Sequence, residues 1–518
     1  MTYPKHFNHA ESSLSTGTWD DEMGNGVDQL FFISSYSDFD KLAHGPRGSE
    51  ANHSVHVYRF HPHDGSMLLL NIHGKAQDLE NPAFSVYHPR LPVVYTCSEN
   101  IYDNGRIFAF SVGEDGSLTQ LGEPIDAGGT STCYLTIDHS QKHMLAVNYW
   151  DSTLVVIPLD YETGRITGPI QSCYDPKGGD CVVAAGRSKG GVNHSDNDAK
   201  TIEVRQKDPH SHALELDPYV GTLAYVPCLG KDVVREFFYN RKMGEIGMEL
   251  NTLPSGLRQG MADGPRYFEF HPKLPIAYCI NEFSATVAVF EVNRDLLEEM
   301  AQASDDGQDM NQFKGRSTLR LIQSIKTIPS AFPTSMNTCG RICVHKSGRF
   351  VLVANRGHQS IAIFRVIQKG PKKGELKTIG YFHTRGETPR HFNFDASGQY
   401  LIVANQDTDT IAIFNFNLSS GEITFTGNEY GVPSPNFVCC CPLSGVEDSV
   451  DEHVGQLEDT VMVPRKKSDA ADDNASSASD GSSTVPTELP AQKDLIDELK
   501  RAREEIASLK EQLSAVKP

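Results

Sequence analysis

The sequence predicts an all-β protein, a seven-bladed β-propeller that is closed by both ends of its repeat region. Six times along the chain a hydrophobic segment reaches a turn and a second hydrophobic segment follows, as in Tyr267–His271 and Ile276–Ile280. Each such pair is typical of a β-hairpin. Successive turns lie about 50 residues apart, or further where extra loops intervene, which suits a four-stranded propeller blade better than a helical repeat of roughly 34 residues.

Two more positions keep a constant distance from each turn. The turn residues are His88, Asp138, Asp217, His271, His345 and Asp395. The residues five positions before and eleven positions after them form the pairs Ala83/Glu99, Cys133/Tyr149, His212/Cys228, Arg266/Glu282, Gly340/Arg356 and Arg390/Gln406. Because the strands of a hairpin are antiparallel, both members of a pair return to the same end. Each repeat thus projects two side chains toward one rim, and we expect the functional site there.

The two ends of the repeat region supply the seventh blade. Phe31–Tyr36 matches the second strand of the unit, and Asn436–Pro442 matches the first. Pairing of these segments would remove the open sheet edge through which β-sheets otherwise aggregate. Asn436 and Tyr36 then complete the ring of rim positions.

Charge and composition narrow the class of partner. A net charge of −20 argues against nucleic acid or an anionic membrane as the main partner. No segment approaches the ~20 consecutive apolar residues that span a bilayer, and the first residues lack the apolar core of a signal peptide. The 11 cysteines include no Cys-x-x-Cys pair, which favours buried thiols over a disulfide framework. We therefore expect a soluble cytoplasmic protein, in which a local arginine cluster could still bind a small anion.

Shifts in composition predict the domain boundaries. Residues 1–27 are polar and Gly-rich, as in a flexible N-terminal arm, and residues 28–443 contain the repeats. Residues 444–492 are acidic and Ser-rich. Such a segment buries too little apolar surface to fold alone, so we expect a disordered linker. Two insertions, 175–207 and 293–316, exceed most connections in compact domains and are interpreted as lids or disordered loops.

Residues 493–516 have the pattern of a short coiled coil. Their apolar residues alternate spacings of four and three, the a/d seam of a heptad repeat. The seam consists of Leu495, Leu499, Ala502, Ile506, Leu509 and Leu513. Because about three heptads are only marginally stable alone, we expect a homo-oligomer that pairs these helices. The alternative is a single solvated helix.

Several motifs, taken in order and in register, resemble a known family. They are Gly264–Tyr267 with Cys279–Glu282, Val353–Gly357, and Thr388–Phe392 with Val403–Gln406. These segments resemble the seven-bladed lactonase family, which includes cycloisomerase-type 6-phosphogluconolactonases and fungal carboxy-cis,cis-muconate cyclases. The similarity extends from about Leu30 to Pro442. The chain departs from the family in the stretch Asp38–Asn52 and in both long insertions.

The resemblance implies an active site at one end of the channel, built from a histidine, arginines and a glutamate. The matching positions are His212, Arg266, Glu282 and Arg356. His210 belongs to the same His-x-His segment, while Arg390 and Glu99 share the registers of Arg266 and Glu282. We expect these last three residues to contact substrate.

This group of residues fits a small anionic sugar lactone. A guanidinium binds carboxylate or phosphate oxygens with a planar fork, so Arg266, Arg356 and Arg390 could hold the substrate and stabilise an oxyanion. Glu282 could act as the general base toward water, and His212 could transfer the second proton near neutral pH. The predicted function is hydrolysis of a lactone such as 6-phosphogluconolactone, without a cofactor. A muconate-type lactonising cycloisomerase would use the same groups and stays open.

Each residue also has a non-catalytic explanation. Arg266 and Glu282 could form an ion pair between two strands of one blade, and Glu99 could have a structural role at a blade edge. His210 and His212 could bind a metal, but no register-matched carboxylate or cysteine set completes a site, so no metal is expected. The propeller could also be a non-enzymatic interaction scaffold. A scaffold, however, does not need histidine, glutamate and several arginines on one rim.

Deletion of everything after about Gly445 should convert an oligomer into a monomer and leave the propeller folded and active. The ring closes through its own ends, so its core does not depend on the helix, whereas the leucine seam is buried only against another helix. Light scattering on the full-length and truncated proteins measures the difference. Equal masses would mean that the seam does not pair, and loss of folding would mean that the last blade is misplaced.

Overall fold

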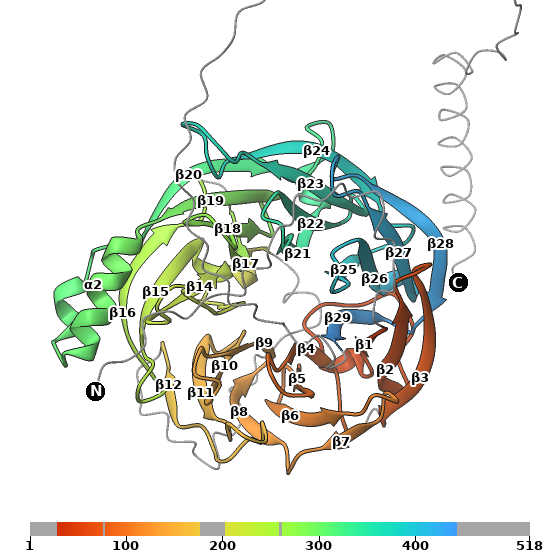
Figure 1. The fold of residues 1–518 in the computed structure, drawn as a ribbon, viewed down its shortest axis with the longest axis horizontal. Helices are drawn as coiled ribbons and strands as arrows, with labels where there is room; N and C mark the ends of the chain where they lie inside the picture. Colours follow the sequence, from red (N-terminus) through yellow and green to blue (C-terminus); the bar gives the residue numbers. More distant parts are fainter. Residues whose placement is uncertain (1–27, 76–77, 177–201, 258–261, 443–518) are drawn as a thin grey trace, which may run out of the picture. The chain divides into compact units, whose positions relative to one another are not determined.

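Seven antiparallel sheets surround a central axis in the computed structural model of this chain (Figure 1). The structure describes residues 28–75, 78–176, 202–257 and 262–442. Within these ranges six sheets have four strands and one has five. The predicted seven-bladed β-propeller is therefore confirmed. The predicted arm, linker and coiled coil lie outside the described residues.

We number the blades in chain order, and blade 7 is the one that contains both ends of the repeat region. Blades 1 to 3 consist of β4 (Pro82–Tyr87), β5 (Val93–Ser98), β6 (Asn104–Val112), β7 (Leu118–Gln120) and β8 (Ile125–Thr130); β9 (Thr132–Ile137), β10 (His143–Asn148), β11 (Thr153–Pro158) and β12 (Ser172–Tyr174); and β13 (Glu215–Leu216), β14 (Leu223–Cys228), β15 (Val233–Asn240) and β16 (Glu245–Pro254).

The remaining blades repeat the same order of four strands. They consist of β17 (Pro265–Phe270), β18 (Ile276–Asn281), β19 (Thr286–Val292) and β20 (Leu319–Lys326); β21 (Thr338–Val344), β22 (Phe350–Arg356), β23 (Ser360–Val366) and β24 (Leu376–His383); β25 (Pro389–Phe394), β26 (Tyr400–Asn405), β27 (Thr410–Phe416) and β28 (Ile423–Gly431); and, in blade 7, β29 (Pro435–Pro442), β1 (Gln29–Ser35), β2 (His53–His61) and β3 (Ser66–Lys75).

Blade 7 joins the two ends of the repeat region, as the sequence predicts. Its strand order is β29-β1-β2-β3, and the antiparallel register runs from Gln29 opposite Pro442 to Ser35 opposite Pro435. Figure 1 shows the red β1 beside the blue β29. Backbone hydrogen bonds between the ends of the propeller domain thus close the ring.

The residue that marks each predicted turn also holds that turn in place. The Asp217 carboxylate accepts hydrogen bonds from the backbone N–H groups of residues 219–223. His271 Nδ1 accepts from the N–H groups of residues 273 and 274, and its Nε2 donates to the carbonyl oxygen of Gly348 at 2.7 Å. Because Gly348 belongs to the next blade, this histidine fixes a turn and links two sheets.

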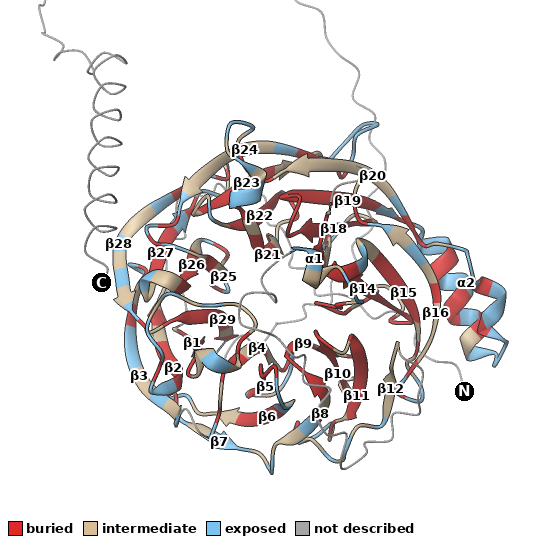
Figure 2. Cartoon of the chain, turned by 180° about the vertical axis from the view of Figure 1, so that it is seen from behind, coloured by how far each residue is buried: buried red, intermediate tan, exposed pale blue. Residues whose placement is uncertain are grey.

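The hydrophobic core lies between neighbouring blades. Every residue of β5, β14 and β18 is buried, whereas the outermost strand β3 is mostly exposed or half-buried. Figure 2 shows the same gradient from the inside to the outside of the ring. Inner strands pack against a sheet on each side, so both of their faces are apolar.

Nine cysteines of the described residues are free thiols and seven of these are buried, while Cys173 is disulfide-bonded.

Residues 293–316 are ordered, which corrects their interpretation as a lid or disordered loop. Helix α2 (Arg294–Asp305) begins after Asn293, whose side-chain oxygen caps the first turn at 3.1 Å, and the 3-10 helix η4 (Met310–Phe313) follows. The apolar side of α2, including the fully buried Leu297, packs against blades 3 and 4. The insertion thickens the outside of the ring (Figure 1). None of the helices in the described ranges is long and apolar enough to cross a bilayer.

Candidate active site

A β-bulge lies at the start of the innermost strand of each blade. In blade 4 the ladder pairs Pro265 with Asn281 and Tyr267 with Ile280, so that Arg266 has no partner opposite it. An extra residue of this kind bends the strand and re-aims its side chain. The bulges contain the predicted register residues Ala83, Cys133, His212, Arg266, Gly340, Arg390 and Asn436. The repeat register therefore marks the residues that are turned toward the channel.

The second predicted rim position follows the same ladder, with one correction. The N–H of Glu282 donates to the carbonyl oxygen of Gly264 at 2.7 Å, and its counterparts in blades 1, 2, 6 and 7 form the same bond. In blade 3 the turn after the first strand is one residue longer than in blade 4. Leu229, whose N–H bonds the carbonyl oxygen of His210 at 2.8 Å, therefore occupies the rim position there. The pairing of Cys228 with this position was wrong.

Three arginines surround the carboxylate of Glu282. Its Oε1 lies 2.7 Å from Arg205 Nη1, and its Oε2 lies 3.2 Å from both Arg266 Nε and Arg356 Nη2. Arg205 comes from the short helix α1 (Ile202–Arg205) and also donates from Nε to the Tyr149 hydroxyl at 3.0 Å. The ion pair between Arg266 and Glu282 thus exists, but as part of a larger cluster that joins several blades.

The close packing of these charged groups shifts the pKa of Glu282 and of Arg356. Burial alone would raise the pKa of the Glu282 carboxyl, but Arg205, Arg356 and Arg266 hold that pKa well below its usual range. Burial, together with Arg266 and Arg390 and against the attraction of Glu282, lowers the pKa of Arg356 to about 10. A carboxylate held this strongly in its ionised form is a weak proton acceptor. Glu282 therefore orients and partly neutralises the arginines.

A second group of charged residues adjoins the first. Arg390 Nη2 lies 3.9 Å from Glu99 Oε2, and its guanidinium carbon lies 5.1 Å from the centre of the Tyr36 ring. The Tyr36 hydroxyl donates to Glu99 Oε2 at 3.0 Å. Both groups together contain four arginines and two carboxylates, a surplus of two positive charges. This surplus suits a dianionic ligand.

His212 lies beside the arginines as a neutral ring. It packs edge-on against Tyr149 and Tyr267, with centroid distances of 5.4 Å to each ring, and the Arg266 guanidinium carbon is 4.4 Å from the centre of the Tyr267 ring. Burial and the charge of Arg266 hold the pKa of His212 well below its usual range. Its buried Nδ1 has no hydrogen-bond partner among the described residues. This nitrogen is therefore the candidate for proton transfer in the site.

His210 occupies a different place from its neighbour. Its ring stacks on Tyr149 at 4.9 Å and meets the edge of Trp150 at 4.7 Å, and burial lowers its pKa to about 4. His210 therefore packs against Tyr149 and is not part of the arginine cluster. Across the part of the chain that the structure describes, no three His, Cys, Asp or Glu residues are grouped as metal ligands would be.

Two residues of the site were not predicted from the sequence. Arg205 belongs to the 175–207 insertion, and His44 belongs to the Asp38–Asn52 stretch that departs from the family pattern. The His44 ring packs edge-on against Tyr36 at 5.1 Å. Both residues lie outside the repeated strands, so the register gives no signal for them. The unusual length of their segments was the one available indication.

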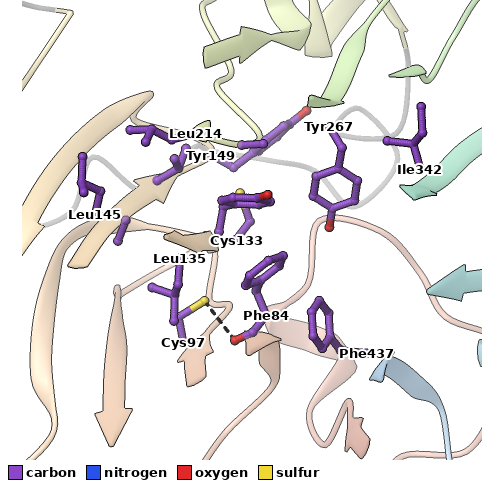
Figure 3. Packing of buried hydrophobic residues seen from close by; sticks show 14 of the residues in the cluster. Phe84, Cys97, Cys133, Leu135, Leu145, Tyr149, Leu214, Tyr267, Ile342 and Phe437 are labelled. Carbon is purple, nitrogen blue, oxygen red and sulfur yellow. Dashed lines mark hydrogen bonds between the residues drawn. The ribbon is translucent and has the colours of Figure 1, made fainter. Parts of the chain in front are cut away.

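A layer of aromatic rings fills the channel below the arginines. Its members, Phe84, Tyr134, Tyr267, His391 and Phe437, each come directly after a bulged residue. The ring centroids of Phe84 and Tyr134 are 4.3 Å apart, those of Phe84 and Phe437 are 4.6 Å apart, and those of His391 and Phe437 are 3.8 Å apart. Figure 3 shows Phe84, Phe437 and Tyr267 converging from three blades. The layer forms an apolar floor under the site.

A second polar network joins residues that follow the bulges: Tyr134 and Arg341 come directly after a bulged residue, and Glu215 and Glu269 come three residues after one. Tyr134 donates to Glu215, and Arg341 Nη2 lies 2.7 Å from Glu269 Oε1. Burial, only partly offset by the bond from Tyr134, raises the pKa of Glu215 to about 7. Tyr134 belongs to both this network and the aromatic floor, and the Arg341 guanidinium carbon lies 5.6 Å from the centre of the Tyr267 ring.

Replacement of Glu282 by glutamine should destabilise the protein by about 3–5 kcal/mol, the usual effect of removing one partner of a buried ion pair. Three buried arginines would then lack their counter-charge, so added phosphate should restore much of the lost melting temperature. Thermal unfolding with and without phosphate measures both effects. Glu291→Gln, which breaks an exposed pair with Arg320, is the control and should change stability by about 0–1 kcal/mol. Equal effects of the two substitutions on the melting temperature would mean that Glu282 is not the shared counter-charge of three buried arginines.

Replacement of Glu215 by glutamine should stabilise the protein more at pH 8 than at pH 5. A carboxyl whose folded pKa is raised contributes stability below its unfolded pKa of about 4.3, and that contribution is lost as the pH rises through about 7. The neutral amide avoids this loss. Melting temperatures of both proteins across the range should diverge by a few degrees toward high pH. A constant difference would mean that Glu215 does not titrate there.

Comparison with known proteins agrees with this architecture. Residues 31–440 match the family described as Lactonase, 7-bladed beta-propeller. A 6-phosphogluconolactonase of Bacillus subtilis is 27% identical over 361 residues, which cover 70% of this chain and 87% of the relative. A second one, from Formosa agariphila, is 26% identical over 372 residues, covering 71% of this chain and 90% of the relative.

Solved structures show the same fold. A putative 6-phosphogluconolactonase of Bacteroides uniformis superposes with a TM-score of 0.60 at 22% identity, and a periplasmic gluconolactonase of Pseudomonas aeruginosa with a TM-score of 0.60 at 21% identity. Each comparison covers 80% of this chain and 99% of the solved chain. The match of this family over residues 31–440 shows that the chain belongs to the seven-bladed β-propeller lactonase family.

Proposed function

We propose that this protein hydrolyses a small acidic sugar lactone, most readily 6-phosphogluconolactone, at the arginine-rich end of the propeller channel. The observation that carries the proposal is the surplus of two positive charges around Glu282 and Glu99, next to a neutral histidine. A phosphorylated lactone brings the matching dianion. The names of the relatives in Bacillus and Formosa support the same substrate class.

We assign the proton transfers to His212 and not to Glu282. His212 is neutral and its Nδ1 has no hydrogen-bond partner among the described residues, whereas both oxygens of Glu282 face guanidinium groups. The free Nδ1 of His212 can accept a proton from a bound water, whereas both oxygens of Glu282 are already occupied by guanidinium groups. A substrate anion that offsets the charge of Arg266 would raise the basicity of the His212 imidazole. This assignment exchanges the roles that the sequence suggested for the two residues.

The reaction then follows from the arrangement. His212 takes a proton from water as the water oxygen bonds to the lactone carbonyl carbon, and the carbonyl electron pair moves to its oxygen. Arg356, whose buried Nε has no partner among the described residues, stabilises that oxyanion together with Arg266. When the oxyanion collapses, the bond from the carbon to the ring oxygen breaks, and His212 returns its proton to the departing oxygen. The product is the open-chain sugar acid.

A panel of lactones tests the proposal. The full-length protein should hydrolyse 6-phosphogluconolactone faster than glucono-δ-lactone, and His212→Asn should lower kcat by about 10²–10⁴-fold with little change in KM, the effect of removing a general base. His53→Asn, at an exposed position at the start of β2, is the matched control and should retain full activity. If His212→Asn keeps wild-type activity, the histidine is not the base. If no lactone is hydrolysed, the proposed function is wrong.

Glu282→Gln should have a different kinetic signature. Loss of a negative charge that competes for three arginines strengthens the binding of an anionic substrate and so lowers KM. At the same time kcat falls, because the arginines lose their fixed positions. A fall in kcat with unchanged KM would favour Glu282 as the general base instead.

A lactonising cycloisomerase remains the second candidate. The same surplus of positive charge would also fit a substrate with several carboxylates, and the reaction needs proton transfer to or from carbon by the same histidine. A carboxylated muconolactone in the panel distinguishes the lactonising cycloisomerase from the sugar lactonase.

Homo-oligomer formation through residues 493–516 and a cytoplasmic location remain predictions from the sequence.

A further inference from the structure

One connection on the rim of the channel is much longer than its counterparts. The loop between the second and third strands has three to five residues in blades 1 to 6, but in blade 7 it extends over the seventeen residues from Tyr36 to Asn52. We call residues 36–52 the strap. It includes the 3-10 helix η1 (Phe39–Lys41). In every blade but the fifth this loop starts at the rim position, and the strap therefore starts at the rim residue Tyr36, next to Arg390 and Glu99.

The first half of the strap is attached to blade 1. Asn81 Oδ1 accepts a hydrogen bond from the backbone N–H of Ser37 at 2.9 Å. Lys41 forms an ion pair with Glu80, and its carbonyl oxygen accepts from the N–H of Ile101 at 3.1 Å. Backbone and charged contacts together hold this half in one position.

The second half is attached to blade 6, on the other side of blade 7. Arg47 Nε lies 3.0 Å from Asp407 Oδ2, and Ser49 Oγ donates to Asp409 Oδ2 at 2.7 Å. Gly48 packs so closely that a Cβ at this position would lie 2.4 Å from Asp409 Oδ1. The strap is therefore fixed at both ends and crosses the rim between two blades.

His44 lies between the two attachments, next to the second charged group. Its ring packs edge-on against Tyr36, the same ring over which the Arg390 guanidinium lies at 5.1 Å. The Nε2 of His44 is buried and has no hydrogen-bond partner among the described residues. Burial, then Arg390, Arg356, Arg205 and Arg266, hold the pKa of His44 well below its usual range.

We propose that His44 is a specificity residue that, together with Arg390, binds the phosphate group of a phosphorylated lactone. This inference rests on the proposed function because it assigns one end of the same substrate. His212 and Arg266 would face the reacting carbonyl, and His44 and Arg390 would face the distal phosphate. The lengthened strap thus adds a hydrogen-bonding group that the repeated strands do not provide.

The proposal also predicts that binding is coupled to a proton. The His44 ring contacts Tyr36, whose hydroxyl donates to Glu99, and the charges of Arg390, Arg356, Arg205 and Arg266 act on it. A bound phosphate dianion would offset the arginine charges that now disfavour imidazolium. His44 should then take up a proton at neutral pH, which turns its interaction with phosphate into a charge-assisted hydrogen bond.

A purely structural role for His44 makes a different prediction. If the ring only packs against Tyr36, its replacement should weaken binding of phosphorylated and unphosphorylated ligands alike. The ratio of the two affinities therefore distinguishes the roles, even where the variant loses some stability.

Titration calorimetry of the full-length protein with 6-phosphogluconate and with gluconate tests the inference. At pH 7, in buffers of different ionisation enthalpy, the wild-type protein should prefer 6-phosphogluconate and take up protons on binding it. His44→Asn should reduce that preference by about 10- to 100-fold, the usual effect of losing a hydrogen bond to a charged group, and should reduce the proton uptake. His44→Gln, whose longer side chain can place its amide nitrogen where Nε2 lies in histidine but cannot titrate, should retain more of the preference but show the same reduced uptake. His53→Asn is the control and should match the wild type.

The outcomes separate this inference from the proposed function. An unchanged preference in His44→Asn, in a protein that hydrolyses lactones, would overturn the role of His44 and leave the lactonase proposal standing. Equal weakening toward both ligands would likewise overturn it in favour of a packing role. If the wild-type protein binds neither sugar acid and hydrolyses no lactone, both proposals fail.

Discussion

The pairing of β1 with β29 is the interaction on which the rest of the structure depends. Residues that are far apart in the sequence meet in the channel only because the ring is closed, and closure requires the register from Gln29/Pro442 to Ser35/Pro435. A ring also removes the free edges that an open array of sheets would expose. Arg390 of blade 6, Tyr36 of blade 7 and Glu99 of blade 1 could not form one group if this blade opened.

Within the closed ring, bulges convert a regular repeat into a functional site. A regular strand alternates its side chains between two faces, whereas the extra residue in each bulge redirects one side chain. In five of the seven blades the residue after it is aromatic and joins the floor of the channel. Seven equivalent positions thus hold six different kinds of residue at one end of the axis, with arginine in two of them. In blade 5 the bulge contains Gly340, whose carbonyl oxygen accepts from Arg266 Nη1 at 3.0 Å. A Cβ there would lie 2.7 Å from the carbonyl oxygen of Arg390, so glycine allows the neighbouring strands to approach.

The electrostatic field of the arginines sets the protonation states of the histidines and of Glu282. Burial, reinforced by the positive charge of the arginines, holds the pKa of His212 and of His44 well below the usual range, so both rings are neutral before substrate binds. The same charge holds Glu282 ionised and occupies its oxygens. A bound dianion would neutralise the surplus of two positive charges and so raise the pKa of the nearby histidines. Binding and proton transfer are therefore expected to be linked in this site.

The sequence by itself determined the β-propeller, the number of blades and the closure by both ends, because its hairpins repeat with a constant register. Equivalent residues of a repeat take equivalent places in each blade. The rim positions predicted in this way were His212, Arg266, Glu282, Arg356, Arg390 and Glu99. The sequence could not show that Leu229, and not Cys228, occupies the rim, because one added residue in a turn shifts the register locally. Nor could it show that residues 293–316 form a helix on the outside of the ring. Only the tertiary structure decided that Arg205 and His44 enter the site, since irregular loops have no period and their paths depend on contacts such as that of Arg47 with Asp407. The roles of Glu282 and His212 likewise depend on how many arginines meet in space, which no spacing along the chain records.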